Sequence, residues 1–245
     1  MTDLQYKRIV WIAFIILCLC GFIYSSYEII MWNFNVEENS KINDKLNEKV
    51  TVTKKDNKYE IDFKSLKEIN SDTIGYVKVN NTNIDYVVVK GTDNEYYLKH
   101  NFEKKWNIAG WIFGDYHNKF DGSDRHLIIY GHNTKDGSMF GTLTNILEAD
   151  WYKNIHNHKV LLVTENGTYQ YQVFSTYSIV PEDYYINTQF KNDSDFAEFI
   201  KVLKSRSIYD YGVDVSEKDK ILTLSSCIGD GEKRVVLHAK LIENK

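Results

Sequence analysis

The chain has 245 residues, of which 43% are hydrophobic and 14% aromatic, and this composition suffices for one folded domain with its own core. Its formal net charge is −4, with acidic and basic residues interspersed, so it lacks the concentrated basic face of a nucleic-acid-binding protein. We therefore expect one folded domain that binds no nucleic acid.

An uncharged apolar run occupies residues 9–27. Its length comes close to the roughly 20 residues that cross a bilayer core as a helix. Lys7 and Arg8 precede the run and Glu28 follows it, which favours a cytoplasmic N-terminus. No small-residue cleavage site follows, so an uncleaved anchor is favoured over a signal peptide. We expect a cytoplasmic tail over 1–8, a single transmembrane anchor over 9–27 and an extracellular remainder.

Residues 33–58 are polar and rich in Asn and Lys, and they predict a spacer with some helix, which we place over 28–58. The folded domain is expected over 59–245. Near its start, Phe63, Leu66 and Ile69 recur at three-residue steps, the spacing of a short amphipathic helix. We expect this helix to precede the first strand of the domain.

Eight segments rich in β-branched and aromatic residues follow, each bounded by Asn, Asp or Gly. The short connections between them favour an antiparallel barrel or sandwich over alternating strand–helix units. Between two of the segments, Asn166 and Gly167 predict a type I′ hairpin turn. The eight segments are 76–79, 84–91, 110–116, 126–132, 159–166, 168–180, 220–227 and 234–243.

A helix is predicted over 191–207, between the sixth and seventh strands. Phe196, Phe199, Ile200 and Leu203 are spaced as i, i+3, i+4 and i+7, so they share one apolar face of a helix. The expected fold class is therefore mainly β, with one helix at the start of the domain and another inserted between its sixth and seventh strands.

Cys227 is the only cysteine of the expected extracellular part, because Cys18 and Cys20 lie in the apolar run. An exported thiol with no disulfide partner is either buried or used. His132 follows the fourth strand, and Arg234 opens the eighth. A Cys becomes a nucleophile when a base or cation favours the thiolate and when donors stabilise the oxyanion that forms. We expect these three side chains to meet at one end of the barrel.

Each of the three also has a structural interpretation. Taken alone, a Cys in an apolar strand usually packs, a His after a strand is usually a polar turn residue, and an Arg at a strand start is usually solvated. His126 and His238 alternate with apolar neighbours and are interpreted as structural strand residues. The two His of 156–158 have no third ligand nearby, so no metal site is expected.

Taken together, the segments resemble the sortases, the membrane-anchored cysteine transpeptidases of Gram-positive bacteria, and class B in particular. The sequences TLSSC (223–227), YGHN (130–133) and KRVVLHAKL (233–241) are similar to the family's Cys, His and Arg segments. The resemblance extends from about Phe63 to Ile242, and the inserted helix is a class B feature. It implies an eight-stranded sortase-type β-barrel.

The resemblance also implies an activity. A class B sortase cleaves a C-terminal sorting signal after Thr and transfers the surface protein to an amine of a peptidoglycan precursor of the lipid II type, without a cofactor. Cys227 would form the thioacyl-enzyme, His132 would transfer protons and Arg234 would stabilise the oxyanion. Matching positions imply sorting-signal contacts at Asn94, Leu98, Tyr185, Ile186 and Ser225.

Two alternatives stay open. One is another exported Cys–His acyltransferase, such as an L,D-transpeptidase, although the compact Ser-His-Gly-Cys arrangement of that family is absent. The other is a membrane-tethered β-barrel adaptor in which Cys227 is inert. The sequence also departs from the class B pattern. Val87 stands where Pro is common, Ser226 where Thr is common, His117 where Arg is common, and Pro181 where some relatives carry a contacting Thr.

Overall fold

The computed structural model describes residues 3–53, 58–228 and 233–244. The chain divides into two compact units, Met1–Glu38 and Asn39–Lys245. Helix α1 (Asp3–Asn47) begins in the first unit and ends in the second. Within the described ranges, α1 is the one helix whose length and composition would allow it to cross a membrane.

The spacer predicted from its polar composition contains more regular structure than expected. Helix α1 continues through it to Asn47. An antiparallel pair of short strands follows, β1 (Val50–Thr53) and β2 (Lys58–Ile61). The helix can continue here because its last turns, from Asn39 onward, belong to the compact unit of the barrel.

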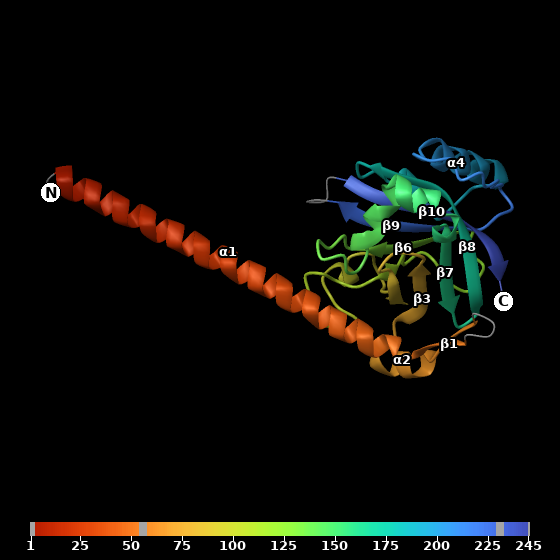
Figure 1. The fold of residues 1–245 in the computed structure, drawn as a ribbon, viewed down its shortest axis with the longest axis horizontal. Coiled ribbons are helices and arrows are strands. Elements are labelled where there is room, and N and C mark those ends of the chain that lie inside the picture. Colours follow the sequence, from red (N-terminus) through yellow and green to blue (C-terminus); the bar gives the residue numbers. More distant parts are fainter. Residues whose placement is uncertain (1–2, 54–57, 229–232, 245) are drawn as a thin grey trace. The chain divides into compact units, whose positions relative to one another are not determined.

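The predicted mainly-β fold is confirmed, because eight strands close into a barrel in the order β10-β8-β7-β3-β4-β5-β6-β9 (Figure 1). One expectation is wrong, however, because not every neighbouring pair is antiparallel. β4 pairs with β5 and β6 pairs with β9 in parallel. The strands are β3 (Thr73–Val79), β4 (Asp85–Val89), β5 (Phe113–Gly114), β6 (His126–Gly131), β7 (Lys159–Thr164), β8 (Gly167–Ile179), β9 (Ile221–Ile228) and β10 (Lys233–Asn244).

The hairpin between β7 and β8 is present, but its predicted turn type is wrong. Thr164 pairs with Gly167, so the two turn residues are Glu165 and Asn166 rather than Asn166 and Gly167. Neither of them has a positive φ; Gly167 has a φ of 151°. A type I′ turn requires positive φ at both central residues. The φ angles of Glu165 and Asn166 therefore exclude this turn type.

Both helices expected in the domain are present. Helix α2 (Phe63–Ile69) begins after Asp62, whose carboxylate accepts a hydrogen bond from the Ser65 amide at 3.1 Å. Helix α4 (Asp193–Ser205) lies between β8 and β9, the sixth and seventh barrel strands. The remaining helical turns are α3 (Ala149–Lys153), η1 (Tyr96–Leu98), η2 (Gly141–Leu147), η3 (Ile155–Asn157) and η4 (Tyr184–Ile186).

Strand alternation separates two hydrophobic cores. Leu222 and Leu224 of β9 belong to the main core inside the barrel, whereas Ile221 belongs to a second core. The second core joins β8, β9 and β10 to Phe196 and Ile200 of α4. Because successive side chains of a strand point to opposite faces, the face of β9 and β10 that α4 covers also carries alternate polar residues, which are important for the site.

The end of α1 is attached to the barrel through Asn39, which is only 1% exposed. Its amide nitrogen donates to the Gly110 carbonyl at 2.9 Å and to Asn107 Oδ1 at 3.2 Å, and its oxygen accepts from Asn107 Nδ2 at 3.0 Å. Removing one partner of buried hydrogen bonds leaves the others unsatisfied.

Asn39→Ala is therefore expected to lower the free energy of unfolding of the barrel unit by about 2 kcal/mol. Urea unfolding of the full-length protein in detergent micelles, followed by tryptophan fluorescence, measures the change. Ser40→Ala is the matched control, because Ser40 is exposed beside Asn39. Equal losses in the two variants would contradict a docking role for Asn39.

Candidate active site

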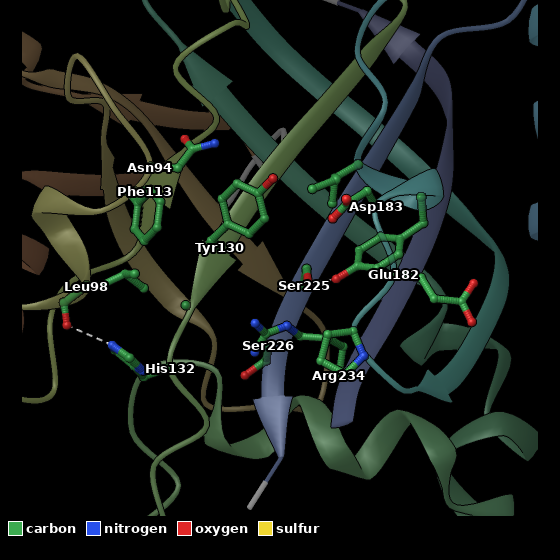
Figure 2. A pocket seen from close by; sticks show the side chains of 14 residues that line it. Asn94, Leu98, Phe113, Tyr130, His132, Glu182, Asp183, Ser225, Ser226 and Arg234 are labelled. Carbon is green, nitrogen blue, oxygen red and sulfur yellow. Dashed lines mark hydrogen bonds between the residues drawn. The ribbon is translucent and has the colours of Figure 1, made fainter. Parts of the chain in front are cut away.

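A cavity of about 230 Å³ opens on the barrel where β6, β9 and β10 lie side by side (Figure 2). Glu182 and Asp183 lie on one side of the cavity and Phe113 on another (Figure 2). The cavity brings together the sequence-predicted residues whose side chains the structure describes. These are His132, Arg234, Asn94, Leu98, Tyr185, Ile186 and Ser225.

The backbone explains why His132, Cys227 and Arg234 come together. Parallel pairing of β6 with β9 places Gly131 opposite Ser226, and the next residue on each strand is His132 or Cys227. Antiparallel pairing of β9 with β10 then places Arg234 opposite Cys227, as the predicted hairpin requires. The side chain of Cys227 and residues 229–232 lie outside the described part of the chain.

His132 is held at the edge of the cavity by a backbone group. Its Nε2 donates to the Leu98 carbonyl at 2.8 Å (Figure 2). Burial lowers the pKa of His132, the bond to Leu98 acts to raise it, and the positive charge of Arg234 lowers it further. The net pKa lies below the ordinary value of 6.5, so the imidazole is mostly neutral at pH 7. With a proton on Nε2, the other nitrogen, Nδ1, is the one able to take up a proton.

Arg234 carries an unused hydrogen-bond donor. Its Nη1 is buried and has no hydrogen-bond partner among the described residues, and the same is true of Ser226 Oγ. Nearby, Tyr185 and Ser225 are joined through their hydroxyl groups at 3.1 Å. Burial raises the pKa of Tyr185, against the opposing effects of Ser225 and Arg234. A guanidinium with a free N–H at a cavity fits a carbonyl oxygen or the oxyanion that develops from one.

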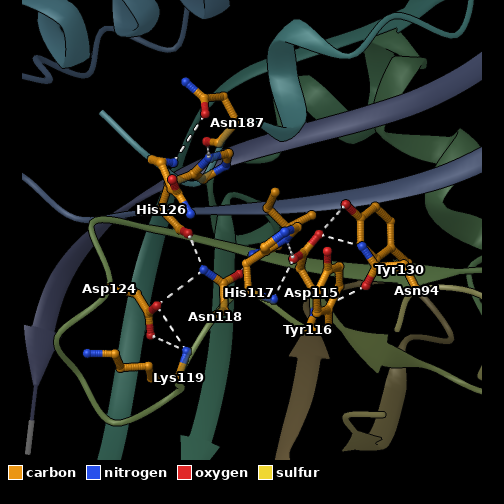
Figure 3. A network of polar contacts seen from close by, with 12 residues as sticks. Asn94, Asp115, Tyr116, His117, Asn118, Lys119, Asp124, His126, Tyr130 and Asn187 are labelled. Atoms are coloured by element: carbon orange, nitrogen blue, oxygen red, sulfur yellow. Dashed lines mark hydrogen bonds and ion pairs between the residues drawn. The ribbon is translucent and has the colours of Figure 1, made fainter. Parts of the chain in front are cut away.

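Asp115 organises one side of the cavity, and the sequence reasoning gave it no role. Its carboxylate is 2% exposed. Oδ2 accepts from Asn94 Nδ2 at 2.8 Å and from the Tyr130 hydroxyl at 2.9 Å (Figure 3). Oδ1 accepts from the amide and the ring Nδ1 of His117, at 2.9 and 2.8 Å. His117, which stands where class B members commonly have Arg, thus donates hydrogen bonds to Asp115. The signal in the sequence that could have indicated this role was an Asp inside the predicted strand segment 110–116.

Asp115 is buried and ionised because of these donors. Burial alone would raise its pKa, but the hydrogen bonds from His117, Asn94 and Tyr130 outweigh burial, and the net pKa is lowered. A carboxylate whose pKa is lowered on folding stabilises the folded state above its unfolded pKa of about 3.9. That contribution is lost as the pH falls through the lower, folded pKa.

Asp115→Asn is expected to lower the free energy of unfolding by about 2 kcal/mol at pH 7, because an amide offers donors to groups that are themselves donors. The difference from wild type should shrink as the pH falls below about 4. Urea unfolding at pH 7, 5 and 3.5 tests this. Asp214→Asn is the control, since Asp214 is exposed on a loop. A pH-independent difference would contradict the assignment.

The comparisons with known proteins agree with this geometry. The sortase domain family matches residues 77–242. Sortase B of Staphylococcus aureus (strain NCTC 8325 / PS 47) is 32% identical over 246 residues, which cover 98% of this chain and 99% of that protein.

Two solved structures are also similar. Sortase B from Bacillus anthracis in complex with AAEK1 is 32% identical, with a TM-score of 0.76 over 86% of this chain and 99% of that chain. A Staphylococcus aureus sortase B–substrate complex is 36% identical, with a TM-score of 0.69 over 74% of this chain and 84% of that chain. The family match, the similar sortase B sequence and the similar barrel structure show that this chain belongs to the sortases, in class B. It is therefore a cysteine transpeptidase that anchors surface proteins.

Proposed function

We propose that this sortase cleaves a C-terminal sorting signal after Thr and transfers the new carboxyl end to an amine of a peptidoglycan precursor of the lipid II type. One observation carries the proposal. The buried Nη1 of Arg234, which has no hydrogen-bond partner among the described residues, belongs to the same cavity as His132, and the backbone of Cys227 lies opposite Arg234. These positions supply a nucleophile, a proton carrier and an oxyanion donor in one place.

In the first half-reaction, Cys227 transfers its thiol proton to the neutral imidazole of His132, and its sulfur attacks the carbonyl carbon of Thr. The carbonyl oxygen becomes an oxyanion, and Arg234 donates hydrogen bonds to it. His132 protonates the leaving amine as the C–N bond breaks. The products are a thioester between Cys227 and the cargo protein, and the released C-terminal peptide.

In the second half-reaction, the precursor amine attacks the thioester carbonyl. His132 accepts a proton from the attacking nitrogen, and Arg234 again stabilises the oxyanion. Collapse of the tetrahedral intermediate breaks the C–S bond and forms the amide, and His132 returns its proton to the sulfur of Cys227. The lowered pKa of His132 suits the second step, because a neutral imidazole is required to accept the proton.

The sorting signal is proposed to lie along the cavity. Leu98 and Ile186 offer apolar contacts, and Ser225 and Asn94 offer hydrogen-bonding groups. Tyr185, which is 3% exposed, also lines the cavity. A pocket with mostly apolar walls and a few polar groups is suited to hold a short peptide in one orientation.

The anchor over 9–27 is proposed to hold the enzyme in the cell membrane as a single-pass protein, with the domain over 59–245 outside the cell. Lys7 and Arg8 before the apolar run support this orientation. Tethering raises the local concentration of membrane-bound substrates, and both the exported cargo and a lipid-linked precursor are found at that surface.

A peptide panel tests the proposed reaction. Full-length protein in detergent micelles is incubated with quenched fluorescent peptides bearing NPQTN-, SPKTG- and LPXTG-like signals, with and without triglycine, and mass spectrometry locates the cleaved bond. We expect cleavage after Thr in wild type and in the Cys18→Ala/Cys20→Ala variant, and none in Cys227→Ala. No cleavage, with Cys227 inert to a thiol reagent, would favour the adaptor alternative.

A further inference from the structure

The wall formed by residues 181–187, which we name the 181–187 segment, belongs to no barrel strand. Its regular structure is the single turn η4, Tyr184–Ile186. Tyr185 and Ile186 of this segment line the cavity, whereas Asn187 is exposed. Because no strand ladder holds the segment, its position depends on the side chains and carbonyls that join it to the barrel.

A set of hydrogen bonds with a buried centre joins Tyr184 and Asn187 of the segment to the outer face of the barrel. On one side of this set, the Tyr184 hydroxyl contacts the Tyr177 hydroxyl at 2.8 Å, and the Tyr177 hydroxyl contacts His238 Nε2 at 2.9 Å. On the other side, His126 Nδ1 lies 2.7 Å from the Asn187 carbonyl oxygen (Figure 3). The two sides approach the segment from different strands, β8 and β6.

Thr223 joins the two halves. Its hydroxyl lies 2.7 Å from His238 Nδ1 and 2.6 Å from His126 Nε2. Thr223 and His238 are 0% exposed and His126 is 1% exposed. We name the whole set the Thr223 network. In order, its members are Tyr184, Tyr177, His238, Thr223, His126 and Asn187.

The protons in the network can be assigned from the Asn187 end. A carbonyl oxygen only accepts, so His126 carries its proton on Nδ1. Burial lowers the pKa of His126 to about 4, which leaves it neutral, and its Nε2 therefore accepts. The Thr223 hydroxyl must donate to that nitrogen. Its one proton is then used, so Thr223 accepts from His238 Nδ1.

The same argument continues to the other end. Burial keeps the pKa of His238 well below its ordinary value, so its bare Nε2 accepts from the Tyr177 hydroxyl. Tyr177 in turn accepts from Tyr184. Each donor thus has one acceptor, and both histidines are Nδ1–H tautomers. A hydroxyl at position 223 can accept from one histidine and donate to the other, and a valine of the same shape can do neither.

We propose that Thr223 is a positioning residue of the transpeptidase, which holds the 181–187 segment against the barrel through two neutral histidines and so fixes the wall that contacts the sorting signal. This rests on the proposed function of the cavity. Thr223 does not line the cavity, so its effect on substrate has to pass through Tyr184 and Asn187.

The variants that test the proposal differ by single atoms. Thr223→Val keeps the shape of the side chain and removes both hydrogen bonds, whereas Thr223→Ser keeps the hydroxyl. Thr176→Val is the matched control, because Thr176 is a buried strand threonine that bonds to the Tyr211 hydroxyl at 2.8 Å and is not part of the network. Tyr177→Phe removes the hydrogen bonds of the Tyr177 hydroxyl to Tyr184 and His238. This variant replaces Thr223→Val in the test if Thr223→Val does not fold.

Full-length variants in detergent micelles are compared in peptide cleavage. We expect Thr223→Val to raise KM about tenfold with little change in kcat, because the two hydrogen bonds of Thr223 no longer hold the wall. Thr223→Ser and Thr176→Val should stay within about threefold of wild type. Alkylation of Cys227 by iodoacetamide, which does not use the wall, should be unchanged in all of them.

Two readouts need no catalysis. Hydrogen exchange followed by mass spectrometry should show faster exchange of the 181–187 segment in Thr223→Val and Tyr177→Phe, but not in Thr176→Val. Nitrogen-15 NMR should show His126 and His238 as Nδ1–H tautomers in wild type. If the wild-type protein cleaves no peptide, the proposed function is overturned. Hydrogen exchange and the histidine tautomers would still test whether the Thr223 network holds the 181–187 segment. Unchanged KM and exchange in the network variants, equal effects in Thr176→Val, or an Nε2–H tautomer would overturn the positioning role.

Discussion

His132→Ala is expected to lower kcat/KM for peptide cleavage about 10³-fold, because the leaving amine then departs without a positioned proton donor. Its cavity position and its bond to the Leu98 carbonyl at 2.8 Å orient the ring for this role. Continuous fluorescence with the preferred quenched peptide measures the loss. His156→Ala is the matched control, since His156 is exposed on a surface turn.

The same account predicts the protonation state of His132. Because burial and the charge of Arg234 lower its pKa, NMR titration in a Cys227→Ala background should give a value below 6.5, the ordinary value. The group then protonates only at acid pH, and the neutral form prevails at pH 7. A value above 6.5, or more than a tenth of wild-type activity in His132→Ala, would contradict the assigned role.

Arg234→Gln is expected to lower kcat about 10²-fold, the usual cost of losing an oxyanion donor. The argument rests on Nη1, which is buried without a hydrogen-bond partner within the described residues and therefore has a donor to offer to substrate. Arg234→Lys should recover only part of the loss, because an ammonium cannot reproduce the planar guanidinium fork.

Two measurements separate this role from a general effect of charge. Lys233→Gln removes the adjacent, exposed cation and should leave kcat unchanged. In Arg234→Gln the pKa of His132 should rise, because a positive charge that lowers it has been removed. Wild-type kcat in Arg234→Gln, or an equal loss in Lys233→Gln, would be inconsistent with oxyanion stabilisation by Arg234.

The sequence predicted the strands and the inserted helix because both depend on local periodicity. Thr223 precedes Leu224 on β9, and Leu237 precedes His238 on β10; both leucines are buried in the main core. Such alternation can be recognised from the sequence of a single segment. The interpretation of His126 and His238 as structural strand residues is confirmed, because every ring nitrogen of the two has a partner within the barrel unit.

What the sequence could not provide was the register between distant segments. The parallel pairing of β6 with β9 joins Ile128 to Thr223, and no turn encodes such a contact. The same limit hid Asp115, whose partners include Asn94 and Tyr130, on either side of it in the chain. The helical spacer was underestimated because Asn39 is stabilised by Asn107 and Gly110, which lie far from it in sequence.

The thioacyl-enzyme is the central claim, and intact-protein mass spectrometry tests it most directly. Full-length protein is mixed with a preferred sorting-signal peptide and quenched in acid within the first turnover, and the modified residue is identified by proteolytic mapping. The account predicts an added mass equal to the peptide up to Thr, located on Cys227, which triglycine removes with formation of a ligated product. Cleavage that proceeds in Cys227→Ala, or an adduct on another residue, would contradict it.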